Sequence, residues 1–440
     1  MAECAFGTDG VRGVVGEPPI TPDLLVRLGY AIGVVLGGPG REVVIAKDTR
    51  LSGYMVESAI EAGLVAAGID TALTGPLPTP AVAHLVAAEG AAAGIVISAS
   101  HNPYRDNGVK VFDAAGSKLS DEQERAIEEI VNGEQSRLRW AAEPGKARRI
   151  DDATDRYVAF CRSTVPGLDL SGLNVVCDAA NGAGYQAAPA ALRALGATVR
   201  EHGCEPDGTN INAGCGALHP QAAAELVTRE GCDLGIVLDG DGDRLQMITA
   251  AGRVLDGDAI LHALSSLWRA QGRAPAGVVG TVMSNQALAD ALAELGVGFE
   301  RSDVGDRNVA QRLRERGWNL GGEPAGHILI LDRHITGDGL IAALAVLAAL
   351  APSKASLAEA SASYEAYPAV LQSIACGPGD GLYAKLAPVV EDLAERDGVR
   401  RAVLRPSGTE PVLRLLVEAR DLELARAAAA DVVARADAAA

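Results

Sequence analysis

Short apolar runs alternate with longer stretches rich in alanine and leucine along most of the chain. The short runs, such as 95–97 and 234–238, have the length and the branched side chains of buried strands. The longer stretches space their apolar residues as amphipathic helices do. Strands that alternate with helices are typical of mostly parallel sheets joined by crossover helices. The pattern therefore predicts an α/β fold.

A weak internal repeat divides this pattern. Three segments each begin with a strand that ends in a small or polar turn, continue into a helix that ends at glycine, and lead to a second strand. A glycine at such a helix end fits a C-cap with positive φ. The shared order predicts three similar units. The segments begin at 43–53, 174–184 and 278–287, and the glycines are Gly68, Gly196 and Gly296.

Each unit also ends a later strand in a polar loop. The loops are SASHNP at 98–103, the loop within 234–244, and GGEPAGH at 321–327. Ligands of open α/β sheets bind beyond the carboxyl ends of the strands. We therefore expect the three loops to converge on one cleft.

The end of the chain follows a different pattern, with strands near 370–376, 401–404 and 412–418, one helix between them and another after them. The expected fold class is three similar mixed α/β domains with mostly parallel sheets around a central cleft, plus a smaller C-terminal α+β domain. We interpret 132–150 as the link between the first two domains. The expected domains are 1–150, 151–253, 254–365 and 366–440.

Composition limits the size of the cores and the class of partner. A chain of 440 residues with 48% apolar residues is too long for one ordinary domain and can bury several cores. A net charge of −18 argues against binding to nucleic acid or to an anionic membrane, since both require basic patches. An anionic small substrate stays open, because a local cluster of Arg and Lys can create positive potential in an acidic protein.

Cysteine usage and the apolar segments bear on the compartment. The seven cysteines are scattered and form no CxxC pair, which favours a reduced, cytoplasmic location. The N-terminus, MAECAFGTDG, lacks the basic and apolar regions of a signal peptide. The apolar stretch 340–350 is too short to cross a bilayer and predicts a buried helix, so we expect no membrane partner.

The strongest local motif is DGDGDR, with Asp239, Asp241 and Asp243 at every second position. Glycines between the carboxylates allow them to turn toward one point, and hard oxygen ligands of this kind suit Mg²⁺. An EF-hand is excluded, because Arg244 and Ala250 stand where that loop needs Gly and Glu. A solvated acidic turn is the alternative, but three like charges beside a buried strand are unfavourable without a cation.

Ser100 is the candidate nucleophile in the loop after the strand 95–97. No Gly-x-Ser-x-Gly elbow surrounds it, so acyl transfer is not indicated. A phosphorylated serine beside Mg²⁺ is one interpretation, and a polar turn before Pro103 is the other. We expect Asp106-Asn107-Gly108 to form a tight turn that brings Lys110 back toward Ser100.

Two further segments have the residues of an anion site. RPSGTEPVLR, 405–414, combines a Ser-Gly-Thr turn with two arginines, and arginine binds phosphate bidentately. FGTDGVRG, 6–13, has a similar character, whereas a nucleotide P-loop motif is missing. Glu323 and His327 flank a glycine-bounded turn where they could bind sugar hydroxyls, or His327 could be a core-edge histidine.

These motifs in this order resemble the α-D-phosphohexomutase superfamily. The resemblance spans 6–418 and rests on FGTDGVRG, GIVISASHNPYRDNGVKVF, DGDGDR, VGDR at 304–307, GEPAGH, TGDG at 336–339 and RPSGTEP. The DNGVK and VGDR forms are similar to the phosphoglucosamine mutase branch rather than to phosphomannomutase or phosphoglucomutase.

The resemblance implies a role for each matching residue. Ser100 would carry the phosphoryl group as phosphoserine and, with Asp239, Asp241 and Asp243, would hold one Mg²⁺. The other residues at the transfer point would be His101, Lys110, Arg12 and Arg244, with Lys110 or His101 as the base. The substrate-binding residues would be Thr8, Glu323, Ala325, His327, Arg405, Ser407, Gly408, Thr409 and Arg414. Ala325 departs from the family, which has serine in this position, so one hydrogen bond to the sugar would be lost.

The implied reaction interconverts glucosamine 6-phosphate and glucosamine 1-phosphate through a sugar 1,6-bisphosphate, which also serves as activator, and feeds UDP-N-acetylglucosamine and cell-wall synthesis. The partner would be a phosphorylated hexosamine. Phosphomannomutase or phosphoglucomutase activity, a Mg²⁺-dependent phosphatase with Asp239 as nucleophile, and a non-catalytic sugar-phosphate binder are the alternatives. A homodimer and activation of Ser100 by a kinase or by autophosphorylation stay open.

Overall fold

The computed structural model describes residues 4–7, 9–38, 40–133, 140–353, 355–377, 381–407 and 411–439. The chain forms two compact units. The first comprises Met1–Met283 and Val297–Ser361, and the second comprises Ser284–Gly296 and Ala362–Ala440.

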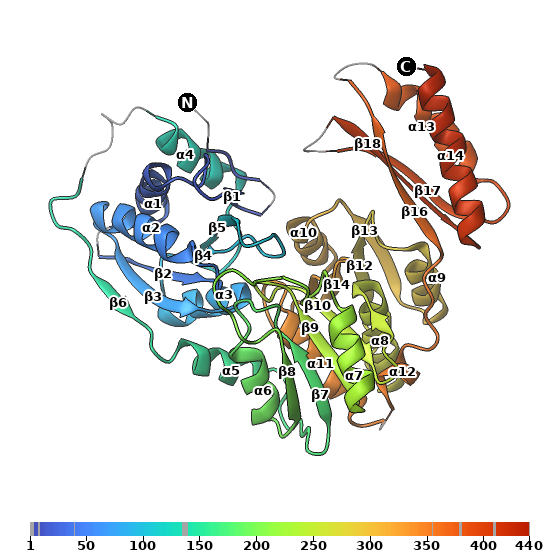
Figure 1. Ribbon diagram of the computed structural model, residues 1–440, viewed down its shortest axis with the longest axis horizontal. Helices are drawn as coiled ribbons and strands as arrows, with labels where there is room; N and C mark the ends of the chain where they lie inside the picture. The colour runs from blue at the N-terminus through green and yellow to red at the C-terminus, as the bar shows by residue number, and fades with distance from the viewer. Residues whose placement is uncertain are drawn as a thin grey trace. The chain divides into compact units, whose positions relative to one another are not determined.

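The first unit begins with a mixed sheet of six strands (Figure 1). They are β1 (Val11–Val14), β2 (Glu42–Lys47), β3 (Asp70–Pro76), β4 (Ala93–Ile97), β5 (Asp106–Asp113) and β6 (Ala147–Arg149). The helices around this sheet are α1 (Pro22–Leu36), α2 (Gly53–Ala66), α3 (Thr79–Glu89) and α4 (Asp121–Val131). The strand order is β1-β5-β4-β2-β3-β6, with a parallel centre and an antiparallel edge at β5 and β1.

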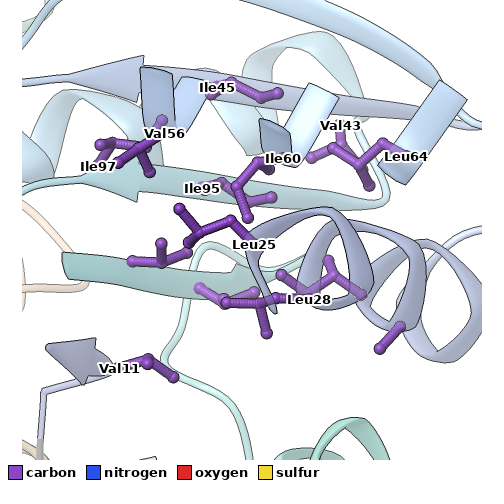
Figure 2. Close-up of a cluster of buried hydrophobic side chains, with 14 of the residues drawn as sticks. Val11, Leu25, Leu28, Val43, Ile45, Val56, Ile60, Leu64, Ile95 and Ile97 are labelled. Carbon is purple, nitrogen blue, oxygen red and sulfur yellow. The ribbon is translucent and has the colours of Figure 1, made fainter. Parts of the chain in front are cut away.

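Alternation along β4 divides its side chains between two layers of helices. Ile95 and Ile97 enter the cluster that α1 and α2 cover, together with side chains such as Leu28 and Ile60 (Figure 2). Gly94 faces α3, where an added Cβ would lie only 2.6 Å from Val86. Because both faces are buried, the strand is a continuous apolar run, as the sequence indicates.

The predicted tight turn at Asp106-Asn107-Gly108 is wrong. These residues begin β5 and pair antiparallel with β1, Asp106 opposite Val14 and Gly108 opposite Arg12. The chain reverses earlier, in the loop at 100–105. Asp-Asn-Gly favours a turn locally, but pairing with β1, together with the hydrogen bond that the Gly108 carbonyl accepts from the Ser98 N–H, outweighs that preference.

The second sheet has five strands in the order β11-β10-β9-β7-β8. They are β7 (Asn174–Asp178), β8 (Thr198–His202), β9 (Leu234–Leu238), β10 (Leu245–Thr249) and β11 (Val254–Leu255), accompanied by α5 (Ala153–Ser163), α6 (Ala187–Ala194) and α7 (Gln221–Glu230). The central strands β8, β7 and β9 are parallel, and β10 and β11 extend the sheet antiparallel. The fully buried β9 ends directly before the aspartate motif.

The third sheet has the order β13-β12-β14-β15. Its strands are β12 (Gly277–Thr281), β13 (Gly298–Ser302), β14 (Leu320–Gly322) and β15 (Ile328–Ile330), and the helices of this part are α8 (Gly257–Ala270), α10 (Asp306–Arg316), α11 (Gly339–Leu350) and α12 (Leu357–Ala360). The stretch predicted as a buried helix is α11, which is buried on nearly every side. Among the described residues, no helix is both long and apolar enough to span a membrane.

The second unit is a smaller α+β structure. Its elements are α9 (Gln286–Glu294), β16 (Ala369–Ala375), α13 (Leu382–Ala394), β17 (Val399–Pro406), β18 (Val412–Ala419) and α14 (Leu422–Ala439). The antiparallel order is β16-β18-β17, and α9 is tied to it by the Gln286 backbone N–H, which donates to Glu418 at 2.9 Å. Three mixed sheets and this antiparallel sheet confirm the predicted α/β fold class. The three repeat glycines, Gly68, Gly196 and Gly296, have positive φ as predicted.

Candidate active site

The polar loops of the three sheets in the first unit meet at one place. Ser100, after β4, donates from Oγ to Asp239 Oδ2 at 2.6 Å, although the two residues are far apart in sequence. Arg244, at the end of the aspartate loop, forms an isolated β-bridge with His327 of the loop between β14 and β15. The prediction that these loops converge is therefore confirmed.

Ser100 has an unusual backbone conformation. Its φ is 50°, in the left-handed region that is unfavourable for residues other than glycine. Its N–H donates to Ser98 Oγ at 2.9 Å, and its side chain is buried against Asp239. A non-glycine residue held in this region beside charged groups is typical of a functional site.

The loop after β9 brings Asp239, Asp241 and Asp243 together. One carboxylate oxygen of each lies within 4.8 Å of the others, and all three residues are buried. Gly242 allows the sharp backbone course with a φ of 75°. Asp241 Oδ1 and Asp243 Oδ1 accept no hydrogen bond from the described residues. Buried carboxylate oxygens with spare lone pairs fit a hard divalent cation, so the triad could hold a metal ion.

The charges of the triad conflict with one another. Burial raises the pKa of Asp239 well above its usual range, and the neighbouring Asp243 and Asp241 raise it further. Burial also opposes ionisation of Asp243, but Lys110 and His327 lower its pKa well below the usual range. A divalent cation would relieve the repulsion among these carboxylates.

Lys110 lies beside the triad because β5 pairs antiparallel with β4, placing it opposite Val96. Its Nζ is 2.7 Å from Asp241 Oδ2, 3.2 Å from Asp243 Oδ2 and 3.0 Å from Asp9 Oδ2. Burial opposes its charge, but these carboxylates raise the pKa of Lys110 well above its usual range. Lys110 is therefore a protonated ammonium in this arrangement.

His101 differs from Lys110 in charge. Its Nδ1 lies 3.2 Å from Ser100 Oγ. Burial, together with the positive charges of Arg244 and Arg12, lowers the pKa of His101 to about 4. The imidazole is therefore neutral and can accept a proton. Arg244 is held in place through its backbone N–H, which donates to Asp239 Oδ1 at 3.1 Å.

The loop predicted to contact the sugar lies next to the triad. Glu323 Oε1 accepts a hydrogen bond from the Gly305 N–H at 3.0 Å. Ala325 is exposed. The buried His327 places Nδ1 3.7 Å from Asp243 Oδ1. Burial opposes protonation, but Asp243 and nearby carboxylates raise the pKa of His327 to about 9.

Four polar or charged residues around this site, Asp9, Thr79, Lys118 and Asp306, were not predicted as site residues from the sequence. Lys118 donates from Nζ to Asp9 Oδ1 and to Asp306 Oδ1, each at 2.8 Å. Arg12 also donates to Asp9, and Thr79 donates from its hydroxyl to Asp241. Asp9 and Asp306 lie within motifs that already stood out, FGTDGVRG and VGDR. Lys118 and Thr79 have no local sequence signal, since their partners are distant in the chain.

The predicted phosphate-binding residues of the C-terminal domain belong to the second unit. Arg405 in β17 stands directly opposite Arg414 in β18. Like charges in such a cross-strand pair destabilise a sheet, and an anion would relieve their repulsion. Ser407 follows β17 and donates its N–H to the carbonyl of Val412 at 2.9 Å. Three other predicted substrate-binding residues, Thr8, Gly408 and Thr409, lie outside the described residues.

Family models match nearly the whole chain in four consecutive parts. They are phosphoglucomutase/phosphomannomutase alpha/beta/alpha domain I over residues 3–138, domain II over 155–252, domain III over 256–367, and the C-terminal domain over 357–435.

Curated relatives and solved structures agree with this match. The phosphoglucosamine mutase of Bordetella avium is 52% identical to this chain, and the match covers 96% of this chain and 97% of that protein. The phosphoglucosamine mutase of Alcanivorax borkumensis is 50% identical, and the match covers 96% of each. A phosphoglucomutase/phosphomannomutase family protein from Burkholderia thailandensis superposes with a TM-score of 0.82 at 26% identity, covering 99% of this chain and 98% of that one. Aspergillus fumigatus N-acetylphosphoglucosamine mutase, solved with GlcNAc-6P and magnesium, superposes with a TM-score of 0.67 at 19% identity, covering 100% of this chain and 96% of that one. This likeness supports the fold alone.

Proposed function

The chain belongs to the phosphoglucomutase/phosphomannomutase family of isomerases, and we propose that it interconverts glucosamine 6-phosphate and glucosamine 1-phosphate. The observation that carries the proposal is the 2.6 Å contact between Ser100 Oγ and Asp239 within the buried carboxylate triad. The sugar assignment is supported by relatives near 50% identity that are phosphoglucosamine mutases. The product would feed the synthesis of UDP-N-acetylglucosamine and cell-wall precursors, in the cytoplasm, where the free cysteines stay reduced.

The reaction we infer consists of two phosphoryl transfers, one from Ser100 to the sugar phosphate and one from the sugar bisphosphate back to Ser100. In the first, the bond between Ser100 Oγ and phosphorus breaks, and a bond forms between phosphorus and the free hydroxyl of the sugar phosphate. The sugar hydroxyl gives its proton to a base, and the leaving Ser100 Oγ takes up a proton. The resulting 1,6-bisphosphate then turns around and its other phosphoryl group returns to Ser100. In that second transfer the Ser100 hydroxyl gives its proton to the base, and the sugar oxygen released from phosphorus takes up a proton. Free sugar 1,6-bisphosphate would act as activator by phosphorylating Ser100.

Mg²⁺ is the cation that we assign to Asp239, Asp241, Asp243 and the Ser100 phosphate. When bound, it would neutralise negative charge on the transferring group. The remaining positive charge would come from Arg12, Arg244 and the ammonium of Lys110, which stabilise the transferring phosphoryl oxygens.

His101 is the better candidate for the base. Its neutral imidazole accepts a proton at physiological pH, because burial and two arginines hold its pKa at about 4. Three carboxylate neighbours raise the pKa of Lys110 and keep it protonated, so it would first have to lose a proton. These opposite pKa shifts are what supports His101 as the acceptor and Lys110 as a fixed positive charge in this proposal.

Each unit carries residues that we assign to substrate binding. Glu323 and His327 would contact the sugar, and the exposed Ala325 offers no hydroxyl to it. Arg405, Ser407 and Arg414 would hold the distal phosphate, together with Gly408, Thr409 and Thr8. We retain four domains bounded at 150, 253 and 365, a homodimer, and a first phosphorylation of Ser100 by a kinase or by autophosphorylation as parts of the proposal.

The test replaces Ser100 with alanine and measures isomerisation of glucosamine 6-phosphate in the presence of sugar bisphosphate. We expect the variant to lose turnover, and intact-mass measurement should find one phosphoryl group on the wild type and none on Ser100→Ala. Undiminished turnover of the variant would contradict the phosphoserine mechanism. Release of inorganic phosphate instead of isomerisation would indicate a phosphatase, and faster turnover of glucose or mannose phosphates would correct the sugar.

A further inference from the structure

A buried arginine, Arg50, binds the loop that carries Ser100. The side chain of Arg50 is completely buried, and its guanidinium donates to four backbone carbonyls of this loop. Nη2 donates to Ser100 O at 3.0 Å and to Asn102 O at 2.8 Å, while Nη1 donates to Asp106 O at 3.1 Å and also to Pro103 O. Only a planar fork with several donors can bind four carbonyls at once.

Asn212 binds two of the same carbonyls from another part of the chain. Its Nδ2 donates to Ser100 O at 2.9 Å and to Asn102 O at 3.1 Å. Both oxygens therefore accept hydrogen bonds from Arg50 and from Asn212. The Gly240 backbone encloses Ser100 further, since an added Cβ at Gly240 would lie 2.4 Å from Ser100 O.

A second chain of hydrogen bonds connects Arg50 to the amide of Ser100. Arg50 Nε donates to Asp48 Oδ2 at 2.8 Å, and Ser98 donates from Oγ to the same oxygen at 2.6 Å. Ser98 Oγ in turn accepts from the Ser100 N–H at 2.9 Å. Both backbone groups of Ser100 are thus fixed by buried side chains, while its hydroxyl is directed toward Asp239.

We propose that Arg50 and Asn212 are positioning residues that hold Ser100 in its left-handed conformation, so that Oγ stays over the carboxylate triad during both phosphoryl transfers. The inference rests on the proposed function. The phosphoryl group leaves Ser100 and later returns to it, so the oxygen must occupy the same place in both steps. A displacement of about 1 Å in a reacting group can lower a rate by about a hundredfold.

The test compares Asn212→Ala with a matched control, Asn132→Ala. Asn132 also donates from Nδ2 to a backbone carbonyl, Cys4 O at 2.8 Å, but that carbonyl is remote in sequence from the Ser100 loop. For Asn212→Ala we expect kcat to fall by about ten- to a hundredfold with KM for the sugar phosphate unchanged. Amide hydrogen exchange of 98–103 should be faster than in the wild type. Asn132→Ala should keep the kcat and the exchange rate of the wild type in that segment.

A second variant, Arg50→Lys, retains the charge beside Asp48 but cannot reach four carbonyls. We expect a larger fall in kcat than for Asn212→Ala, again with faster exchange of the Ser100 loop. Unchanged kcat in Asn212→Ala would overturn the proposal, and so would unchanged exchange in that variant. Absence of isomerisation by the wild type would refute the proposed function instead, and the exchange comparison would still decide whether Asn212 holds the loop.

Discussion

At the scale of single residues, protonation distinguishes two side chains that the sequence presents as equivalent bases. His101 follows Ser100 directly and Lys110 lies later in the same stretch. In isolated peptides histidine titrates at about pH 6.5 and lysine at about pH 10.4. In the folded chain, burial and arginines make His101 neutral, and three carboxylates keep Lys110 charged. The difference arises from groups that are distant in sequence.

His101→Gln and Lys110→Met should therefore differ in their effect on the metal site. We expect His101→Gln to lower kcat by roughly 10²- to 10⁴-fold, the usual contribution of a general base, without changing Mg²⁺ affinity. Lys110→Met should lower kcat and also change Mg²⁺ affinity, because Lys110 contacts Asp241 and Asp243 directly. Steady-state kinetics and Mg²⁺ titration of the thermal unfolding temperature measure both quantities. Normal turnover in His101→Gln would return the role of base to Lys110.

At the scale of elements, the start of α11 supports the aspartate loop. This segment is TGDG at 336–339, a motif noted in the sequence without a role. Asp338 caps the helix by accepting from the Ile341 N–H at 2.9 Å, and the Tyr157 hydroxyl donates to it at 2.9 Å. The Gly339 N–H donates to the carbonyl of Gly242 at 3.1 Å. The helix end thus fixes the glycine between two of the triad aspartates.

Gly339→Ala should destabilise the protein through this close approach. An added Cβ would lie 2.5 Å from the carbonyl oxygen of Arg244, and overpacking of this kind typically costs about 1–3 kcal/mol. Gly53→Ala is the control, since Gly53 is also the first residue of a helix and an added Cβ there meets its nearest atom at 3.4 Å. Urea unfolding measures both variants. Equal stability of the two would contradict the packing argument.

At the scale of the whole molecule, an acidic chain concentrates its chemistry where positive and negative groups compensate one another. The net charge is −18, yet the site combines the carboxylate triad with Lys110, Lys118, Arg12 and Arg244. The triad joins the first and second sheets through the contact of Ser100 with Asp239. Ion binding at this place should therefore increase the stability of the folded chain as well as support its activity.

Removal of metal should reveal this coupling. After treatment with a chelator, we expect added Mg²⁺ to raise the unfolding temperature. At a hundred times its Kd, Mg²⁺ should increase the free energy of unfolding by about 2.7 kcal/mol. Asp241→Asn should reduce that stabilisation and the activity together. Asp155→Asn, which changes an exposed carboxylate in the first turn of α5, should respond to Mg²⁺ as the wild type does. If Asp241→Asn bound Mg²⁺ with wild-type affinity, the triad would not be the site.

The sequence alone predicted the alternation of strands and helices, the three similar units, the buried α11, and Ser100, Asp239, Asp241 and Asp243 as candidate residues. The elements and the aspartate triad follow from local spacing and residue chemistry, whereas the role of Ser100 is what the resemblance to the family implies. Tertiary structure decided that Asp106-Asn107-Gly108 extends β5 instead of turning, because β1, which is distant in the sequence, pairs with all three residues.

Tertiary structure also decided which side chains surround Ser100. Arg50, Asn212 and Lys118 have no distinguishing spacing, and each acquires its role from a partner many residues away. The protonation of His101 and Lys110 depends in the same way on burial and on charges from other loops. Local patterns predict which residues are chemically capable, whereas folding sets their distances, their burial and therefore their charge.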